Sequence, residues 1–529
     1  MKSYLNIFFL TFLIIKITSP LSDEEFCDMN ACEALESFRT DLDVHLEKFN
    51  ETLKNEKYEL IKLERRVRSL EQPIWQISSS GDRWSNCIES RSCKCKPEIK
   101  SLSCWNNEML VLPKDQVVPN DILSIDLGIN SLTTLHMKVF WGLSKITEID
   151  IFDNKIDYLP EDIFENLLEL KYLRLHKNFL EELSKEIFSS QRNLRSLDLS
   201  NNKLRDLPSG IFRGCPNLIV LHLSSNRIKK INKNLFDNLI LLEDLDLNGN
   251  NLIHLEKFTF KDLMSLKRLK LAENDIVDLD SGVFNNLFSL EYLNLRKNEI
   301  LIIRKDLLNN LHNLTILQLS SNKIVKIDSG SFNDLKQLRE LHLQQNFIYE
   351  LPEELFNQTT RLEKLLLFSN NLEELKARTF NGLNNLTALL LNNNLLTTIH
   401  HTVFSYVRNL KKLHLDSNKF LFLPSKSLDV LQQLTTVKLT KNPWHCDCNM
   451  LYLSAWIDKN SHKLWDSQPT CKGPGKLGGA PLKDMNFDKL CHGQWASMVH
   501  LAARIPVRPP SFTPPPFSSV TESEKLQNK

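Results

Sequence analysis

The sequence predicts an α/β protein: a curved solenoid with a parallel β-sheet on its concave face, preceded by a coiled-coil helix. Two observations predict this fold. Asparagine recurs every 24 residues from Asn130 to Asn442, and each one ends the pattern L-x-x-L-x-L-x-x-N, with Ile or Val replacing some leucines. Upstream, residues 35–70 carry a heptad pattern of apolar residues. A fixed period of this length is typical of solenoids, in which each repeat contacts only its neighbours.

Besides leucine, two residue types, asparagine and phenylalanine, return at a fixed position in nearly every repeat of this chain. The asparagines are Asn130, Asn154, Asn178, Asn202, Asn226, Asn250, Asn274, Asn298, Asn322, Asn346, Asn370, Asn394, Asn418 and Asn442. Ten residues later comes phenylalanine, at 140, 164, 188, 212, 236, 260, 284, 332, 356, 380 and 404, with Leu308 and Leu428 filling two gaps. The 529-residue chain therefore contains fourteen repeats without insertion or deletion, where length alone suggests several domains.

Each part of the repeat has a physical role. The L-x-L pair predicts a short strand whose leucines point inward and whose intervening residues point outward. Identical strands at a constant spacing stack into one parallel sheet. The asparagine amide can satisfy backbone groups that are buried in the turn. The phenylalanine column forms a spine on the far side of the core, where the backbone takes more room, so the sheet lies on the inner side of the curve.

Cysteines flank the repeats at both ends. The first group is Cys87-x5-Cys93-x-Cys95-x8-Cys104, and the second is Asn442-Pro443-Trp444-His445-Cys446-Asp447-Cys448, followed by Trp456, Cys471 and Cys491. With these groups, residues 87–491 resemble the secreted extracellular leucine-rich-repeat proteins with 24-residue repeats and cysteine-rich caps. The resemblance implies an N-terminal cap at 87–120, a solenoid at 121–442 and a C-terminal cap at 443–495. It also implies the disulfides Cys87–Cys95, Cys93–Cys104, Cys446–Cys471 and Cys448–Cys491.

Other uses of cysteine are weaker interpretations. Cysteine with nearby histidine can bind zinc, but the cap spacings in a secreted chain favour disulfides, and we expect no metal. Cys215 stands where an earlier repeat has Leu167, so we expect a buried unpaired thiol that acts as a small apolar residue.

The ends of the chain indicate secretion. Residues 1–22 combine an early lysine, a short apolar run and small residues, which is the pattern of a signal peptide. A membrane anchor is the alternative, but the run is too short to cross about 30 Å of hydrocarbon. Residues 504–529 are rich in proline and predict a disordered, solvated tail. We expect a secreted, extracellular protein with no membrane span, in a compartment where disulfides persist.

Residues 35–72 predict a coiled-coil helix. Nine of eleven heptad a and d positions from Leu35 to Leu70 are apolar, the exceptions being Arg39 and Glu56. Self-association is one interpretation, association with a different chain is a second, and a helix folded back on the solenoid is a third. In the segment 23–34, Cys27 and Cys32 could close a small loop or link two chains. A glycosylation sequon at Asn50 would crowd the seam.

The outward strand positions are the candidate ligand surface. They predict three zones along the concave face. The first is acidic, with Asp126, Glu148, Asp150, Asp198, Asp244 and Asp246; a basic step follows at Arg268, Lys270 and Arg296; an apolar group ends the series at Leu366, Phe368, Ala388 and Leu390. Apolar side chains on a sheet face that meets water suggest a contact site, although single exposed leucines need no explanation. Phe152, Tyr172 and Tyr292 are further aromatic candidates.

Two more sets of residues bear on this surface. His176, His222, His342 and His414 project from strands, and we expect them to be exposed surface residues. Sequons at Asn313, Asn357 and Asn385 fall ahead of the strands or beside the phenylalanine spine. Glycans there would leave the concave face open.

Composition and motifs narrow the function. A net charge of +1, from 66 Lys and Arg against 65 Asp and Glu, argues against nucleic-acid binding. Phosphate-loop, nucleophile-elbow, zinc-protease and dinucleotide motifs are absent, so we expect neither catalysis nor a cofactor. The leading hypothesis is a non-enzymatic scaffold that binds an extracellular protein ligand on the concave face, with multivalent display through the coiled coil. The resemblance allows a role in extracellular matrix, a circulating complex or innate immunity. The alternatives are a non-catalytic regulatory subunit of an extracellular enzyme such as a carboxypeptidase, and a shed receptor ectodomain.

Overall fold

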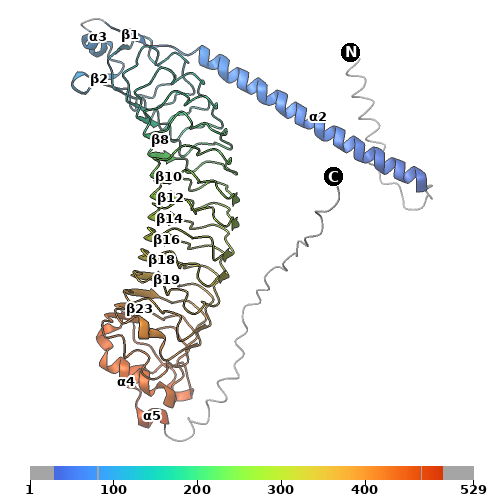
Figure 1. Ribbon diagram of the computed structural model, residues 1–529. Coiled ribbons are helices and arrows are strands. Elements are labelled where there is room, and N and C mark those ends of the chain that lie inside the picture. Colours follow the sequence, from blue (N-terminus) through green and yellow to red (C-terminus); the bar gives the residue numbers. More distant parts are fainter. Residues whose placement is uncertain (1–28, 80–82, 466, 492–529) are drawn as a thin grey trace. The chain divides into compact units, whose positions relative to one another are not determined.

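The computed structural model describes residues 29–79, 83–465 and 467–491 (Figure 1). The chain divides into two compact units, Met1–Arg68 and Ser69–Lys529. The predicted signal peptide, Cys27 and the proline-rich tail lie outside the described residues, and so does the side chain of Cys32.

The first unit contributes one long helix, α2 (Met29–Leu70). It ends three residues before Pro73, in agreement with the predicted stop. The predicted seam residues are open to solvent on this helix, among them Phe49, Leu53 and Leu60. The helix is thus amphipathic in sequence, and much of its apolar stripe lies exposed.

The second unit is the solenoid, whose main sheet has sixteen strands. Fourteen of them are the predicted L-x-L strands, and each is three residues long: β5 (Ser124–Asp126), β6 (Glu148–Asp150), β7 (Tyr172–Arg174), β8 (Ser196–Asp198), β9 (Val220–His222), β10 (Asp244–Asp246), β12 (Arg268–Lys270), β14 (Tyr292–Asn294), β16 (Ile316–Gln318), β18 (Glu340–His342), β19 (Lys364–Leu366), β21 (Ala388–Leu390), β23 (Lys412–His414) and β24 (Thr436–Lys438). Neighbouring strands are parallel, and each residue pairs with the residue 24 positions later, as Asp198 does with His222.

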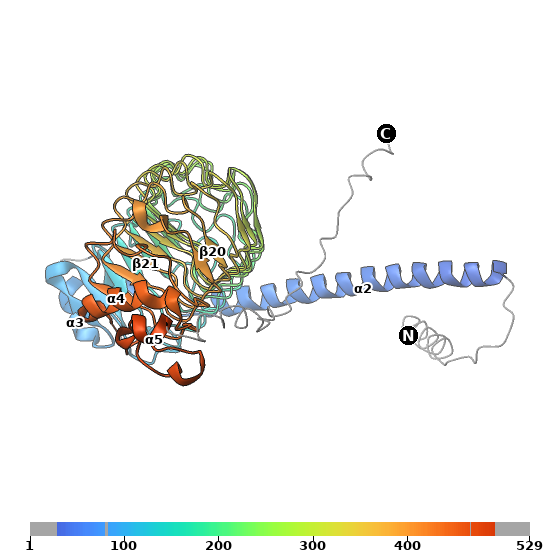
Figure 2. The same cartoon turned by 90° about the horizontal axis from the view of Figure 1, so that it is seen from below.

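The remaining strands close the sheet or border the opposite wall. The cap strands β2 (Lys94–Lys96) and β3 (Ser101–Ser103) form an antiparallel hairpin, and β3 joins β5. Short parallel pairs lie outside the main sheet: β1 (Gln76–Ser78) with β4 (Val117–Pro119), β11 (His254–Leu255) with β13 (Asp278–Leu279), β15 (Ile302–Ile303) with β17 (Lys326–Ile327), and β20 (Glu374–Leu375) with β22 (Thr398–Ile399). The main sheet follows the inner side of the curved stack in Figure 1, and Figure 2 shows β21 and β20 on different walls of it.

The repeat asparagines hold the coils in register. All fourteen are buried. Asn370 is representative: its Nδ2 donates to the backbone oxygens of Leu343 and Leu367 at 2.9 and 3.0 Å. Its Oδ1 accepts from the backbone N–H of Ile348 at 3.1 Å. Because Leu343 and Ile348 belong to the preceding coil, one amide satisfies backbone groups of two coils, as the sequence predicts.

The core consists of the inward leucines and the phenylalanine column. Phe140, Phe164, Phe188 and Phe212 are fully buried, and adjacent rings stack with centroids 6.2 to 6.3 Å apart. Trp75 packs edge-on against Phe140 at the N-terminal end of the column. Cys215 is buried without a disulfide, and burial raises the pKa of its thiol to about 12. It therefore serves as a small core residue.

Disulfide-bonded caps cover both ends of the core. The pairs are Cys87–Cys95, Cys93–Cys104, Cys446–Cys471 and Cys448–Cys491, the four that the resemblance implies. The N-terminal cap adds α3 (Arg83–Ser90) and the 3-10 turn η1 (Pro97–Ile99). In the last repeats and the C-terminal cap lie η2 (Val403–Tyr406), η3 (Cys448–Met450), α4 (Leu451–Lys459), η4 (Ser461–Lys463), η5 (Gly475–Leu477), η6 (Leu482–Asp484) and α5 (Phe487–Cys491). Within the described ranges, no helix has both the length and the apolar character that a membrane span requires.

The asparagine ladder yields a stability prediction. Replacing Asn370 with alanine removes its buried hydrogen bonds and leaves backbone groups of two coils unsatisfied, at a cost of about 3 kcal/mol. Urea and thermal unfolding of the Asn370→Ala variant should show this loss. The neighbouring Asn371 is exposed, so Asn371→Ala is the matched control and should change stability little. Equal effects of the two substitutions would contradict the role of the ladder.

Candidate functional site

All ten concave candidates lie on the outward side of the main sheet. The outward residues form three rows that run across the strands. The first row starts each strand (Glu148, Tyr172, Arg268, Tyr292, Ala388), the second row ends it (Asp150, Lys270, Leu366, Leu390), and the third row follows two residues later (Phe152, Arg296, Phe368). Residues 24 positions apart in one row lie on adjacent strands, about 4.8 Å apart.

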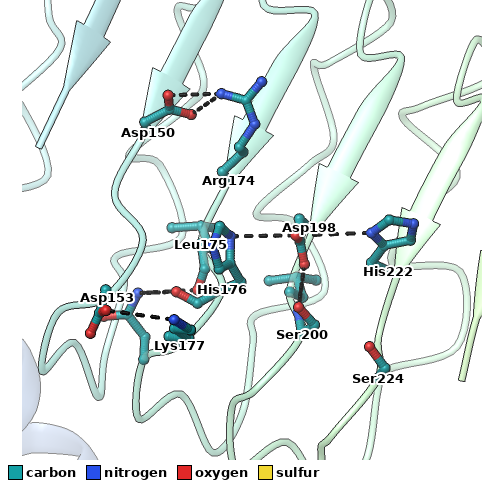
Figure 3. Close-up of polar contacts among 12 residues, drawn as sticks. Asp150, Asp153, Arg174, Leu175, His176, Lys177, Asp198, Ser200, His222 and Ser224 are labelled. Carbon is teal, nitrogen blue, oxygen red and sulfur yellow. Dashed lines mark hydrogen bonds and ion pairs between the residues drawn. The ribbon is translucent and has the colours of Figure 1, made fainter. Parts of the chain in front are cut away.

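An arginine neutralises the start of the acidic zone. Arg174 Nη1 lies 2.6 Å from Asp150 Oδ1 (Figure 3). It also lies 2.7 Å from Glu148 Oε1. Burial raises the pKa of Asp150, and Arg174 opposes this shift. The ion pairs in turn raise the pKa of Arg174 above its ordinary value, outweighing the effect of burial. Arg174 is not among the predicted site residues, although its row position between Asp150 and Asp198 is the signal that could have revealed it.

Two histidines flank Asp198 of β8: His176 lies just after β7, and His222 ends β9. His176 Nδ1 lies 3.4 Å and His222 Nδ1 3.9 Å from Asp198 Oδ2, as Figure 3 shows. Ser200 donates to Asp198 from its hydroxyl at 2.6 Å and from its backbone N–H at 2.9 Å. The His176 ring also stacks on Phe152, with centroids 4.9 Å apart. The expectation that these histidines are exposed is wrong, because both are half-buried and contact a carboxylate.

The surroundings shift the pKa values of Asp198, His222 and His176 in different directions. Burial alone would raise the pKa of Asp198, but the interactions with His222 and Ser200 outweigh it and lower the pKa to about 2. The interaction with Asp198 raises the pKa of His222, whereas burial lowers that of His176. The cluster therefore presents one carboxylate between a histidine that binds its proton more tightly and one that binds it less tightly.

The predicted basic step is not a free basic surface. Arg268 Nε donates to Asp244 at 2.8 Å, and Lys270 Nζ contacts Asp246 at 3.2 Å. Acidic and basic residues of one row lie on adjacent strands, so they pair across the sheet and cancel. The three zones therefore reduce to two: a polar, internally paired zone from Asp126 to Lys270, and a zone with fewer paired charges beyond it.

The apolar group is a single cluster on two strands. Leu366 pairs in register with Leu390, and Ala388 pairs with Lys364. Leu366, Phe368, Ala388 and Leu390 are all half-buried. Lys364 is held at 2.7 Å by Glu340, whose carboxylate also contacts His342 at 3.2 Å. We call Leu366, Phe368, Ala388 and Leu390 the apolar patch.

A tryptophan from the C-terminal cap lies beside Lys412, on the strand next to the patch. Leu464 bridges Val437 of β24, which extends the sheet by one more position. The adjacent Trp465 is 67% exposed, and its ring centroid lies 6.0 Å from Nζ of Lys412. Lys412 pairs in register with Ala388. The repeat pattern could not reveal Trp465, because it lies outside the 24-residue period.

The other candidates are less closely grouped. Tyr172 is exposed beside Arg174, and Tyr292 is half-buried beside Arg268. Arg296 is exposed in the third row. The sequon residues Asn313 and Asn385 donate to backbone oxygens of the preceding coil, at 2.8 and 2.9 Å, on the flank ahead of the strands. In the ranges given above, no three His, Cys, Asp or Glu side chains gather as a metal-binding group.

Family comparisons agree with this architecture. The leucine rich repeat family matches residues 147–204 and 192–252. The BspA type leucine rich repeat region matches residues 229–363, 301–428 and 349–451. A leucine-rich-repeat protein of Leptospira interrogans is similar in structure, with a TM-score of 0.56 and 27% identity over 70% of this chain and 95% of that one. The structure of the Drosophila Toll–Spatzle complex has a TM-score of 0.60 at 22% identity, over 70% of this chain and 55% of that one, a likeness of fold alone.

Sequence relatives match only short stretches. Mouse SLIT and NTRK-like protein 4 is 35% identical over 54 residues, which is 10% of this chain and 6% of that protein. Human carboxypeptidase N subunit 2 is 37% identical over 49 residues, 9% of each chain. The alignments thus span less than a tenth of these relatives.

The Asp198 cluster yields a titration prediction. Because the folded-state pKa of His222 lies above 6.5, its protonated form stabilises the fold below that pH, and the contribution is lost as pH rises through the raised value. The Asp198→Asn variant should bring the pKa of His222 down toward 6.5, as measured by NMR of labelled histidine. Asp206→Asn removes an exposed carboxylate of the same coil and should leave this titration unchanged. An unaltered His222 titration in Asp198→Asn would refute the assigned contact.

Proposed function

Because the chain belongs to the leucine-rich-repeat proteins whose solenoid ends in cysteine-rich caps, we propose that it is a secreted, non-enzymatic recognition protein that binds a protein ligand on its concave sheet. The proposed contact site is the apolar patch together with Trp465. Four disulfides support the extracellular location, since such bonds persist in oxidising compartments.

The observation that carries the proposal is the contrast between the two halves of the concave face. In the N-terminal half, charged side chains pair with one another and are partly satisfied before any ligand arrives. The apolar patch has no such pairing, and its side chains serve no core. Trp465 adds a large amphipathic ring of the kind that anchors protein interfaces.

The charged residues around the patch indicate the charge of the ligand. Lys412 and Lys438 lie on the two strands beyond the patch, and neither forms an ion pair within the described residues. Lys364, by contrast, is neutralised by Glu340. We therefore expect a ligand segment that carries apolar side chains with acidic residues next to them, because opposite charges at the rim favour association.

Multivalent display through α2 is part of the proposal. Phe49, Leu53, Leu60 and Leu63 are all exposed on this helix. An apolar stripe at heptad spacing that lies open to water gains stability by packing against a second helix. Joining two or more solenoids in this way would raise the avidity for a repetitive ligand without any new contact.

A regulatory subunit of an extracellular enzyme is the second candidate. The similarity to carboxypeptidase N subunit 2 favours it, although the alignment covers 9% of each chain. In both candidates the solenoid binds a protein and performs no chemistry, so they differ in the nature of the partner.

The concave site can be tested by substitution. The double variant Leu366→Asp/Phe368→Asp places two charges in the patch and should abolish capture of extracellular partners in a pull-down. Ile316 is an apolar concave residue on β16, two strands away, so Ile316→Asp is the matched control and should retain capture. Unfolding curves of both variants exclude loss of fold. Capture that survives the double substitution would disprove the site, and hydrolase activity in the captured material would favour the second candidate.

The helix can be tested by mass measurement. We expect the full chain to have a higher oligomeric order than the chain lacking residues 35–70 when the two are compared at equal concentrations by native mass spectrometry. Measurements with and without reductant separate a non-covalent seam from a link through Cys27 or Cys32. Equal order in both chains under both conditions would rule out assembly through α2.

A further inference from the structure

One flank of the solenoid carries a stripe of exposed apolar side chains that the repeat does not require. Its members are Ile253, Val277, Leu301, Val325 and Tyr349, each three residues after a repeat asparagine, in five successive coils. Their exposed fractions are 55, 43, 43, 39 and 43%. We call this set the flank stripe.

The same position is polar in the neighbouring coils. It is Asp157, Glu181, Arg205 and Lys229 in the coils before the stripe, and Glu373 and Thr397 in the coils after it. Folding therefore accepts a charged residue at this position. The apolar side chains of the stripe occupy this position in the successive coils of residues 250–369, and they do not pack into the core.

Backbone contacts place the stripe in one row. The N–H of Val277 donates to the oxygen of Ile253 at 3.2 Å, and the N–H of Val325 donates to that of Leu301 at 2.9 Å. The next residues along the chain form the strand pairs β11–β13 and β15–β17 in the same register. Five coils at the usual strand spacing make a stripe about 19 Å long.

Acidic residues beside the stripe on one side of Leu301 have basic counterparts at the same repeat positions on the other side. In the coil of Val277, Asp275 and Asp278 precede and follow the stripe residue. In the coil of Val325, the same two positions are Lys323 and Lys326. Further out, His254 stands in the coil of Ile253, and Glu350 occupies the matching position in the coil of Tyr349.

This distribution is complementary to itself. From it we infer that the flank stripe packs against the same stripe of a second copy of this chain, antiparallel, about a two-fold axis through Leu301. That operation places each residue opposite the residue at the same repeat position, as far from Leu301 in the other direction. Asp275 then faces Lys323 of the second copy, Asp278 faces Lys326, and His254 faces Glu350. A parallel arrangement would place Asp275 opposite Asp278 and Lys323 opposite Lys326, which is unfavourable.

Existing ion pairs do not obstruct this arrangement. Asp278 contacts Arg304 at 2.7 Å, and Lys326 contacts Asp328 at 3.2 Å, but these side chains are at least a third exposed and such pairs contribute little. At the axis two Glu299 residues approach, and each is paired with Lys323 of its own chain. An apolar centre with a charged rim is the usual anatomy of a protein interface.

The sequons leave this flank free. Asn313 and Asn385 follow their repeat asparagines by 15 residues and Asn357 by 11, whereas the stripe follows by 3. A glycan at any of the three would be attached elsewhere around the coil.

The experiment uses the full chain with Leu53→Glu and Leu60→Glu, which place charges in the α2 seam and so isolate the flank contact. Sedimentation equilibrium of this parent should show a concentration-dependent monomer–dimer equilibrium. Adding Leu301→Asp should weaken dimerisation at least about tenfold, because a charge is then buried at the centre of the interface. Leu168, 57% exposed on another part of an N-terminal coil, supplies the control Leu168→Asp, which should leave the dimer unchanged.

A charge swap tests the orientation. Asp278→Lys should weaken the dimer about tenfold by facing Lys326 of the second copy, and Asp278→Lys/Lys326→Asp should restore it to within about threefold of the parent. Thermal unfolding of each variant verifies the fold. A parent that stays monomeric at every concentration, a dimer that survives Leu301→Asp, or a charge swap without rescue would overturn the proposal. None of these outcomes bears on the concave site.

Discussion

The structure depends on one interaction, the buried asparagine amide that connects each coil to the coil before it. A coil of 24 residues has only three residues in its main strand, too few to satisfy its turn by sheet hydrogen bonds alone. The asparagine amide bonds backbone oxygens of two coils and accepts an N–H from the earlier one. A change of length between the strand and its asparagine would displace this amide from its partners. The spacing from strand to asparagine is accordingly the same in all fourteen coils from Asn130 to Asn442.

This constraint leaves the outward positions independent of the fold. Packing determines the inward residues, and hydrogen bonding determines the asparagine. A residue on the concave face therefore has to be compatible only with its neighbours on the adjacent strands. The polar half of the sheet shows such agreement: Asp150 meets Arg174, Asp198 meets His222 and Asp246 meets Lys270. Charges that alternate along a row cancel at a spacing of about 4.8 Å. Acidic and basic residues there are therefore paired with one another.

The parts of the structure that could be predicted from sequence are those with a period or a spacing. The strands, the asparagine ladder and the phenylalanine spine follow from such patterns, whereas the pairing of the cap disulfides follows from the resemblance to the capped extracellular family. The histidine contacts do not follow from the pattern, because the period places Asp198 and His222 on adjacent strands without fixing how their side chains meet. Trp465 could not be found at all in this way, since its position depends on how the cap chain bridges Val437. The flank stripe can be recognised from the sequence, but only by comparing one repeat position across all coils.

The same independence explains how one solenoid can carry several surfaces. The flank stripe and the outward strand positions lie at different places around the coil, so a residue of the stripe can change without altering the ion pairs of the concave face. The apolar patch occupies outward strand positions of coils near the C-terminal end, whereas the flank stripe occupies the third position after the asparagine in coils 250–369. A protein that pairs through its flank keeps its concave sheet open, and each copy then presents one patch. Two patches held at a fixed separation discriminate by the spacing of their ligands as well as by chemistry, which neither surface could achieve alone.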